Sequence, residues 1–282
     1  MMETRSFTGH DGVELVADVG GPTDAPTVLL MHGGGQTRHS WAGATRGLVE
    51  AGYRVVNMDL RGHGDSGWSR AGEYPLSIRA RDIEAVLRDG CNGLALVGAS
   101  LGGVTATTAV GAYGLQADAL VIVDVVPYPE LTGIQRVLEF MNAHPDGFAD
   151  LEEAAAAVAS YNPERPRPRD PKGLKKNLRE GTDGRLRWHW DPAILNMDHE
   201  GDFALFAQAM EAIGRLEKPE VLLVRGMESD IVSDRGVAAL RDMLPRVEVV
   251  DVADAGHMVA GDRNDRFNQG TIEFLRRVLP PS

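Results

Sequence analysis

The feature that most constrains this chain is the stretch from Leu94 to Gly103, where an apolar run stops at a serine flanked by small residues. The run predicts a buried strand, and the residues after Ser100 predict a helix. Gly98, Ser100 and Gly102 fit the pattern G-x-S-x-G, whose glycines leave space for a strained turn from strand to helix. Such a turn exposes the serine hydroxyl, so the pattern predicts a nucleophile at Ser100. A purely structural interpretation, a polar cap between a tightly packed strand and helix, is the alternative.

A serine hydroxyl alone is a weak nucleophile, so this interpretation requires a histidine base, a carboxylate and N–H donors for an oxyanion. Candidate donors follow the apolar strand predicted at residues 27–31, in the run His32-Gly33-Gly34-Gly35. Glycine N–H groups can approach a ligand closely, which an oxyanion hole requires. The alternative is a flexible turn into a helix at 40–51. We expect His32 to hold the shape of this loop.

Strands and helices alternate along the first half of the chain, which predicts a mostly parallel sheet with ligands at the carboxyl ends of its strands. A strand predicted at 53–59 is followed by a polar, glycine-rich loop that carries Arg61, His63 and Asp65. We expect this loop to be a hydrogen-bonded brace beside the site. Every feature singled out so far follows a predicted strand, so these features should meet at one edge of the sheet.

The chain changes character at Pro127, after which helices and irregular turns are predicted as far as Lys218. We therefore divide it into a core of residues 1–126 and 219–282 and a helical cap of residues 127–218. An arginine- and proline-rich segment at 163–171 should be extended. The indoles of Trp188 and Trp190, together with Trp41, are candidates for the wall of an apolar substrate pocket; the first two could instead form a small core of the cap.

Composition restricts the kind of partner. The formal net charge of −12 provides no broad basic surface for nucleic acid or anionic lipid. No apolar stretch reaches membrane-spanning length and no signal-peptide core is present, so we expect no membrane partner. Cys91 is the single cysteine, which is typical of a reducing cytoplasm. The expected partner is a small-molecule substrate, without metal or cofactor, and no sequence pattern declares an oligomeric interface.

Two residues complete a possible catalytic set. Asp230 and His257 each follow a predicted strand, so the chain order is Ser100, Asp230, His257. That is the order of nucleophile, acid and histidine described for the α/β-hydrolase fold. Three other carboxylates lie close to Asp230 in the sequence and are rivals for the acid: Glu228, Asp234 and Asp254.

The chain resembles the α/β-hydrolase superfamily along nearly its whole length. Five segments carry the resemblance: residues 32–35, the loop 59–66, the elbow 98–102, residues 225–230 and Gly256-His257. The resemblance implies an α/β fold, a mostly parallel eight-stranded sheet flanked by helices, with a helical cap inserted after the sixth strand. It also makes Asp124, after that strand, a further rival to Asp230, because some relatives take the acid from there.

Within the superfamily, residues 32–41 and 256–262 are similar to a bacterial branch often grouped with epoxide hydrolases and cofactor-free peroxidases. Epoxide hydrolases of this fold use an aspartate nucleophile, whereas this chain has Ser100. A serine forms an acyl-enzyme from an ester, while ring opening through an alkyl-enzyme calls for a carboxylate. We therefore discount epoxide hydrolysis.

The resemblance implies a mechanism in which His257 takes the Ser100 proton and Asp230 orients the imidazole. The N–H groups of Leu101 and Gly34 would receive the oxyanion, with Gly35 as the alternative donor. The expected activity is hydrolysis of an ester, lactone or thioester of a small apolar substrate. Perhydrolysis, cofactor-free peroxidase activity and C–C bond hydrolysis at the same site are alternatives, as is a ligand-binding protein on a hydrolase scaffold.

Overall fold

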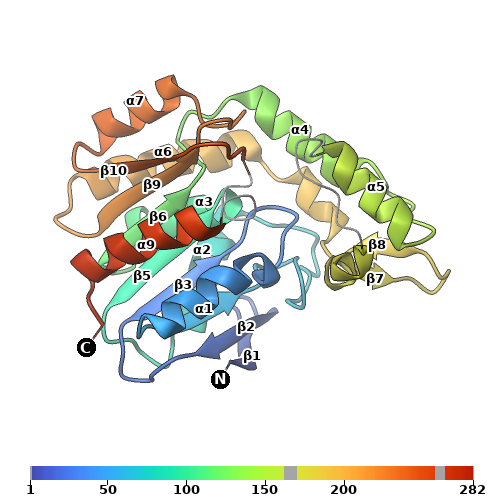
Figure 1. Ribbon diagram of the computed structural model, residues 1–282, viewed down its shortest axis with the longest axis horizontal. Coiled ribbons are helices and arrows are strands. Elements are labelled where there is room, and N and C mark those ends of the chain that lie inside the picture. Colours follow the sequence, from blue (N-terminus) through green and yellow to red (C-terminus); the bar gives the residue numbers. More distant parts are fainter. Residues whose placement is uncertain (1, 162–169, 258–263, 282) are drawn as a thin grey trace.

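An eight-stranded sheet forms the centre of the computed structural model, which describes residues 2–161, 170–257 and 264–281. The strand order is β1-β2-β4-β3-β5-β6-β9-β10, and the helices flank the sheet (Figure 1). The strands are β1 (Glu3–Thr8), β2 (Glu14–Gly20), β3 (Thr27–Met31), β4 (Arg54–Met58), β5 (Leu94–Ala99), β6 (Ala119–Val123), β9 (Glu220–Gly226) and β10 (Glu248–Val252). All neighbouring pairs from β4 to β10 are parallel. The expected mostly parallel, eight-stranded α/β sheet is confirmed.

Apolar side chains on both faces of the central strands explain why helices cover the sheet on both sides, since a buried parallel strand must be shielded twice. One face packs against α1 (Ala42–Glu50) and α9 (Asn264–Val278). The other packs against α2 (Leu76–Val86), α3 (Leu101–Gly111), α6 (His199–Gly214) and α7 (Asp234–Met243). Strands β3, β5 and β6 are buried almost throughout. The loops that follow these strands are therefore held at the carboxyl edge of the sheet.

The cap lies between β6 and β9 in the sequence and projects to one side of the sheet (Figure 1). It contains α4 (Leu131–Asn142), α5 (Leu151–Tyr161), the 3₁₀ helices η2 (Pro171–Asn177) and η3 (Pro192–Asn196), and a hairpin of β7 (Leu178–Glu180) and β8 (Leu186–Trp188). A separate apolar cluster with Phe148, Trp188 and Trp190 forms its core. The indoles of Trp188 and Trp190 stack with centroids 5.0 Å apart, so both contribute to a core of the cap.

Two details of the region 127–218 differ from the expectation. The β7–β8 hairpin is a pair of strands where only helices and turns were expected. Its strands have three residues each, which is too short for the alternation that identifies a strand in a sequence. The last helix, α6, packs along α3 and buries Phe206, Met210 and Ile213 in the main core. It therefore covers the sheet together with α3.

Polar contacts attach the cap to the core. The Tyr74 hydroxyl donates to Asp191 Oδ2 at 2.5 Å, and the Asp191 N–H donates to the Gly62 carbonyl at 2.9 Å. Arg79 of α2 pairs with Asp202 of α6. These contacts connect the start of η3 and the first turn of α6 to the body of the protein.

Some expectations fall outside the described residues: most of the arginine- and proline-rich segment at 163–171, and Met258 to Asp262 of the segment similar to the bacterial branch. Among the helices that the structure describes, none has the length and apolar character needed to cross a membrane.

Candidate active site

The turn at Ser100 has the strained geometry predicted from its sequence. Ser100 has φ 46° and ψ −112°, a left-handed conformation that is rare outside glycine, between the end of β5 and the start of α3. A Cβ on Gly98 would lie 2.3 Å from the Gly102 carbonyl carbon, and one on Gly102 would lie 2.3 Å from the Met31 oxygen. Both glycines are therefore required by space, and together they hold Ser100 at the carboxyl edge of the sheet.

The carboxylate beside His257 belongs to Asp124. His257 Nδ1 lies 2.7 Å from Asp124 Oδ2, and both residues follow strands of the sheet. Ser100 and His257 line the same cavity. The histidine is therefore oriented by the residue at the end of β6, and the expectation that Asp230 plays this part is wrong.

Asp124 is built into the core as an acceptor. Its backbone has φ 50°, and the residue is only 1 % exposed. Oδ1 accepts from the Gly226 N–H at 3.0 Å, and Oδ2 accepts from the Ser229 hydroxyl at 2.6 Å as well as from His257. A buried carboxylate needs such donors to remain charged.

Ser229 is a site residue that the sequence reasoning missed. Its hydroxyl oxygen accepts from the N–H groups of Ile231 and Val232, both at 3.1 Å, while its proton goes to Asp124. The loop after β9 therefore contributes a hydrogen-bond donor to the acid. The one signal in the sequence was its place after a predicted strand, which it shares with its neighbours.

Asp230 lies on the surface beside the cap. Its carboxylate pairs with Arg136 of α4 at 3.0 Å, and both side chains are at least 40 % exposed. The backbone at Ser229 and Asp230 turns so that the serine points to Asp124 and the aspartate to solvent. Of the other rivals, Glu228 and Asp254 are exposed, and Asp234 pairs with Arg225 at 2.6 Å.

The glycine loop after β3 lies against Ser100, since a Cβ on Gly33 would be 3.5 Å from the Ser100 Cβ. The Gly33 N–H donates to Gln36 Oε1 at 3.1 Å, and the Gly35 N–H donates to His63 Nε2 at 3.2 Å. Because the Gly35 N–H is engaged, Gly34 is the better candidate of the two for an oxyanion donor. Leu101 is the first residue of α3, where a helix leaves its N–H groups without intrahelical acceptors.

Two histidines hold the glycine loop through hydrogen bonds, as expected for His32 and for the brace loop that carries His63. His32 is fully buried; its Nδ1 lies 2.8 Å from the Gly33 oxygen, and its Nε2 accepts from the Leu60 N–H at 3.0 Å. Burial lowers the pKa of His32, and lowers the pKa of His63 well below its ordinary value. Both rings are therefore neutral at physiological pH, and each acts as one donor and one acceptor.

Ion pairs fix the brace loop itself. The Arg61 guanidinium pairs with Asp82 at 2.6 Å and with Asp11 at 2.9 Å, and Arg38 pairs with Asp59. Arg61 is 1 % exposed, so its role is to hold this loop against the hairpin of β1 and β2.

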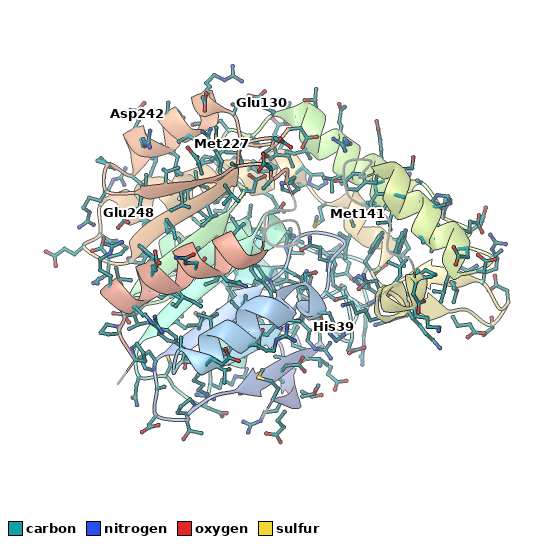
Figure 2. All side chains as sticks on the ribbon, in the orientation of Figure 1. His39, Glu130, Met141, Met227, Asp242 and Glu248 are labelled. Atoms are coloured by element: carbon teal, nitrogen blue, oxygen red, sulfur yellow. The ribbon has the colours of Figure 1, made fainter. Side chains whose placement is uncertain are left out.

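A cavity of about 610 Å³ lies between the core and the cap and reaches Ser100. Figure 2 labels two of its lining residues, Met141 at the end of α4 and His39 in η1 (Arg38–Trp41) of the core. The wall on the side of the cap is mainly apolar and includes Val137, Leu138, Phe140, Met141, Val158, Leu174, Trp188 and Ile194.

Of the three tryptophans expected at the pocket, two line the cavity and one does not. Trp41 and Trp188 line the cavity, as expected. Trp190 stacks behind Trp188 and touches the glycine loop, where its ring is 3.4 Å from a Cβ built on Gly35. Its place is therefore between the cap core and that loop, and its assignment to the pocket wall is corrected.

Among the described residues, no group of three or more His, Cys, Asp or Glu side chains is arranged to hold a metal ion.

Comparison with known proteins places the chain among hydrolases. The chain is 31% identical over 269 residues to esterase Rv0045c of Mycobacterium tuberculosis, covering 90% of this chain and 83% of that protein. It is 31% identical over 212 residues to 2-(acetamidomethylene)succinate hydrolase of Mesorhizobium japonicum, covering 73% of each. A solved structure of E-2-(acetamidomethylene)succinate hydrolase shares the fold, with a TM-score of 0.85 at 24% identity over 98% of this chain and 99% of that one.

The alpha/beta hydrolase family matches residues 28–269, which include the turn at Ser100, the acid at the end of β6 and the histidine after β10. The chain is therefore an enzyme of the alpha/beta hydrolase family.

Proposed function

We propose that this hydrolase cleaves an ester or thioester of an apolar substrate through an acyl-enzyme on Ser100. The observation that carries the proposal is the 2.7 Å contact between His257 and the buried Asp124, at a cavity that Ser100 also lines. A nucleophile on a strained turn, a histidine and a buried acid are the parts that acyl transfer to serine requires. The relative named as an esterase supports the ester class.

In the proposed first step, the Ser100 oxygen attacks the carbonyl carbon while His257 Nε2 takes the hydroxyl proton. Nδ1–H donates to Asp124, which holds the correct tautomer and stabilises the imidazolium. The N–H groups of Leu101 and Gly34 receive the negative charge on the carbonyl oxygen. When the carbonyl re-forms, the alcohol or thiol leaves with the proton from His257.

In the second step, water replaces the leaving group. His257 takes a proton from water as its oxygen attacks the acyl carbon, and the same N–H groups receive the charge again. Collapse of this intermediate breaks the bond to Ser100, which regains its proton from His257. The carboxylic acid is released, and the enzyme returns to its starting state.

The cavity favours an uncharged, apolar acyl or aryl group. Its volume of about 610 Å³ is in the range of sites for small molecules. Its wall on the cap side is formed mainly by aliphatic and aromatic side chains, so burying a charge there would be costly. The cap also shields the reacting carbonyl from bulk water.

The test is release of nitrophenol from nitrophenyl esters of increasing acyl length. We expect turnover that depends on acyl length and that falls by at least about 10³-fold in Ser100→Ala. Asp230→Asn, a change at the exposed ion pair, is the matched control and should keep parental turnover. Equal activity of Ser100→Ala and the parent would contradict the proposal.

A further inference from the structure

His189 belongs to the cap, but its ring is inserted between two loops of the core. The Gly64 N–H of the brace loop donates to His189 Nδ1 at 2.7 Å, and His189 Nε2 lies 3.3 Å from the Gly35 oxygen of the glycine loop. The residue is 2 % exposed. Its own N–H donates to the Asn177 oxygen at the end of η2, which fixes it within the cap.

The hydrogen bonds determine the tautomer of this ring. A backbone N–H can only donate, so Nδ1 must be unprotonated toward Gly64, and the ring proton must be on Nε2. That proton points to the Gly35 oxygen. Burial lowers the pKa of His189 to about 3, so the neutral ring with one donor and one acceptor is the form present near pH 7.

Three histidines thus hold three consecutive peptide groups of the glycine loop. His32 contacts the Gly33 oxygen, which shares a rigid peptide plane with the Gly34 N–H. His63 accepts from the Gly35 N–H, which belongs to the next plane, and His189 donates to the Gly35 oxygen in the third. The direction of the Gly34 N–H is therefore restrained by its own plane and by the two planes that follow it.

Two of these histidines belong to the core, but the third comes with the cap. Gly35 has φ 71°, and the loop has no side chains of its own at positions 33–35 to restrain it. Other cap residues act on the same two loops: Trp190 packs against Gly35, and Arg179 of β7 donates to the Gly64 oxygen. The cap therefore contacts the glycine loop and the brace loop together.

We propose that His189 is a positioning residue that couples docking of the cap to the orientation of the oxyanion-donating Gly34 N–H. The inference rests on the proposed function of Ser100. The cap then closes the cavity and also completes the support of the loop that receives the developing charge. A residue with this role affects the transition state, in which the oxyanion is present, more than the bound substrate.

Two variants separate the two hydrogen bonds of the ring. In His189→Gln, the longer amide can reach the position of Nε2 and donate to the Gly35 oxygen. In His189→Asn, the shorter amide can take the place of Nδ1 and accept from Gly64, but it cannot reach Gly35. We expect His189→Asn to lose about tenfold or more in kcat with little change in KM, and His189→Gln to recover much of that loss. The exposed His10 provides the matched control, His10→Asn.

A second measurement distinguishes a positioning role from a general loss of structure or substrate binding. A trifluoromethyl ketone with the preferred apolar chain forms a tetrahedral oxyanion on a serine, whereas a methyl ketone of the same chain reports binding of the ground state. In His189→Asn, the affinity for the trifluoromethyl ketone should fall by the same factor as kcat/KM, while affinity for the methyl ketone stays parental. Thermal unfolding of each variant shows whether the fold is retained.

The outcomes are separable from those that test the proposed function. Parental turnover that survives Ser100→Ala overturns the proposed function and this inference with it. Turnover that depends on Ser100, with unchanged kcat and trifluoromethyl ketone affinity in His189→Asn, overturns the inference alone. Equal losses for both ketones, or equal defects in His189→Asn and His189→Gln, would also overturn it, because a general role in packing would explain them.

Discussion

The assignment of the acid depends on which of two neighbouring side chains points inward. Strands β6 and β9 are adjacent and parallel, so the loops at their carboxyl ends meet. Asp124 at one end and Ser229 at the other are joined by a hydrogen bond of 2.6 Å, which leaves Asp230 outside. The carboxylate beside His257 and the hydroxyl that supports it thus come from the ends of two adjacent strands.

This arrangement predicts a sharp contrast between two isosteric substitutions. Asp124→Asn removes the charge that stabilises the imidazolium and favours the wrong tautomer of His257, so kcat should fall by about 10³–10⁴-fold. Asp230→Asn removes only an exposed ion pair, and kcat should stay near parental. Steady-state hydrolysis of the preferred nitrophenyl ester measures both. The reverse ranking would restore Asp230 as the acid.

Ser229 should affect how Asp124 acts on His257 in the proposed mechanism. Its hydroxyl donates to the same oxygen of Asp124 that contacts His257. In Ser229→Ala that oxygen loses a donor, so it should attract the imidazolium more strongly and move the acid limb of the kcat/KM profile to higher pH. Ser229→Thr keeps the hydroxyl and should restore the parental profile. A profile that is unchanged in the alanine variant would contradict this role.

The sequence singles out candidate site residues whose signals are local. Ser100 is marked by two glycines that its own turn requires, and His257 stands in the loop after β10. Asp124 was named only as a rival to Asp230 because several carboxylates follow strands, and the choice between them depends on the backbone turn at 229–230. The place of His189 depends on how the cap docks, which no local pattern reports.

At the scale of secondary-structure elements, sequence was most informative for the central strands. Strand β3 reads as continuous apolar residues and is buried throughout. The β7–β8 hairpin was missed because its strands are short. Helix α6 was included in the cap because no strand is predicted between Pro127 and Lys218. Helix α6 packs on α3 in the folded protein, and a local sequence pattern does not show which helix it will contact.

The attachment of η3 to the core should be measurable as stability. Tyr74 and Asp191 are 4 % and 8 % exposed, and the hydroxyl of one donates to the carboxylate of the other at 2.5 Å. Tyr74→Phe leaves that oxygen of the buried carboxylate without the hydroxyl, so the free energy of unfolding should fall by about 1–3 kcal/mol. Chemical denaturation measures the change. Tyr128→Phe, at a 54 % exposed residue, is the control, and equal stability of the two variants would contradict the attachment.

At the scale of the whole molecule, the buried histidines should make stability depend on pH. Their pKa values are lowered in the folded protein, to about 3 for His189. Between the ordinary value of about 6.5 and that lowered value, the unfolded chain binds more protons than the folded one. Stability is therefore fully present above about pH 6.5 and is lost as the pH falls below it.

Removing one of these groups should reduce that dependence. His189→Gln should lower the slope of unfolding free energy against pH by up to about 1.4 kcal/mol per pH unit between pH 6 and 4. Denaturant unfolding at several pH values measures the slope, with the exposed His10→Asn as control. An identical slope in His189→Gln and the parent would show that His189 binds its proton equally in both states.

The most direct test of the account is the mass of the intact protein after brief reaction with a nitrophenyl ester and an acid quench. The account predicts a covalent increase of one acyl group, located by peptide mapping to Ser100 and missing from Ser100→Ala. Asp124→Asn should accumulate the same adduct more slowly, whereas Asp230→Asn should match the parent. An acyl group on another residue, or turnover without any adduct in a rapid-quench series, would contradict the claim that this enzyme works through an acyl-serine.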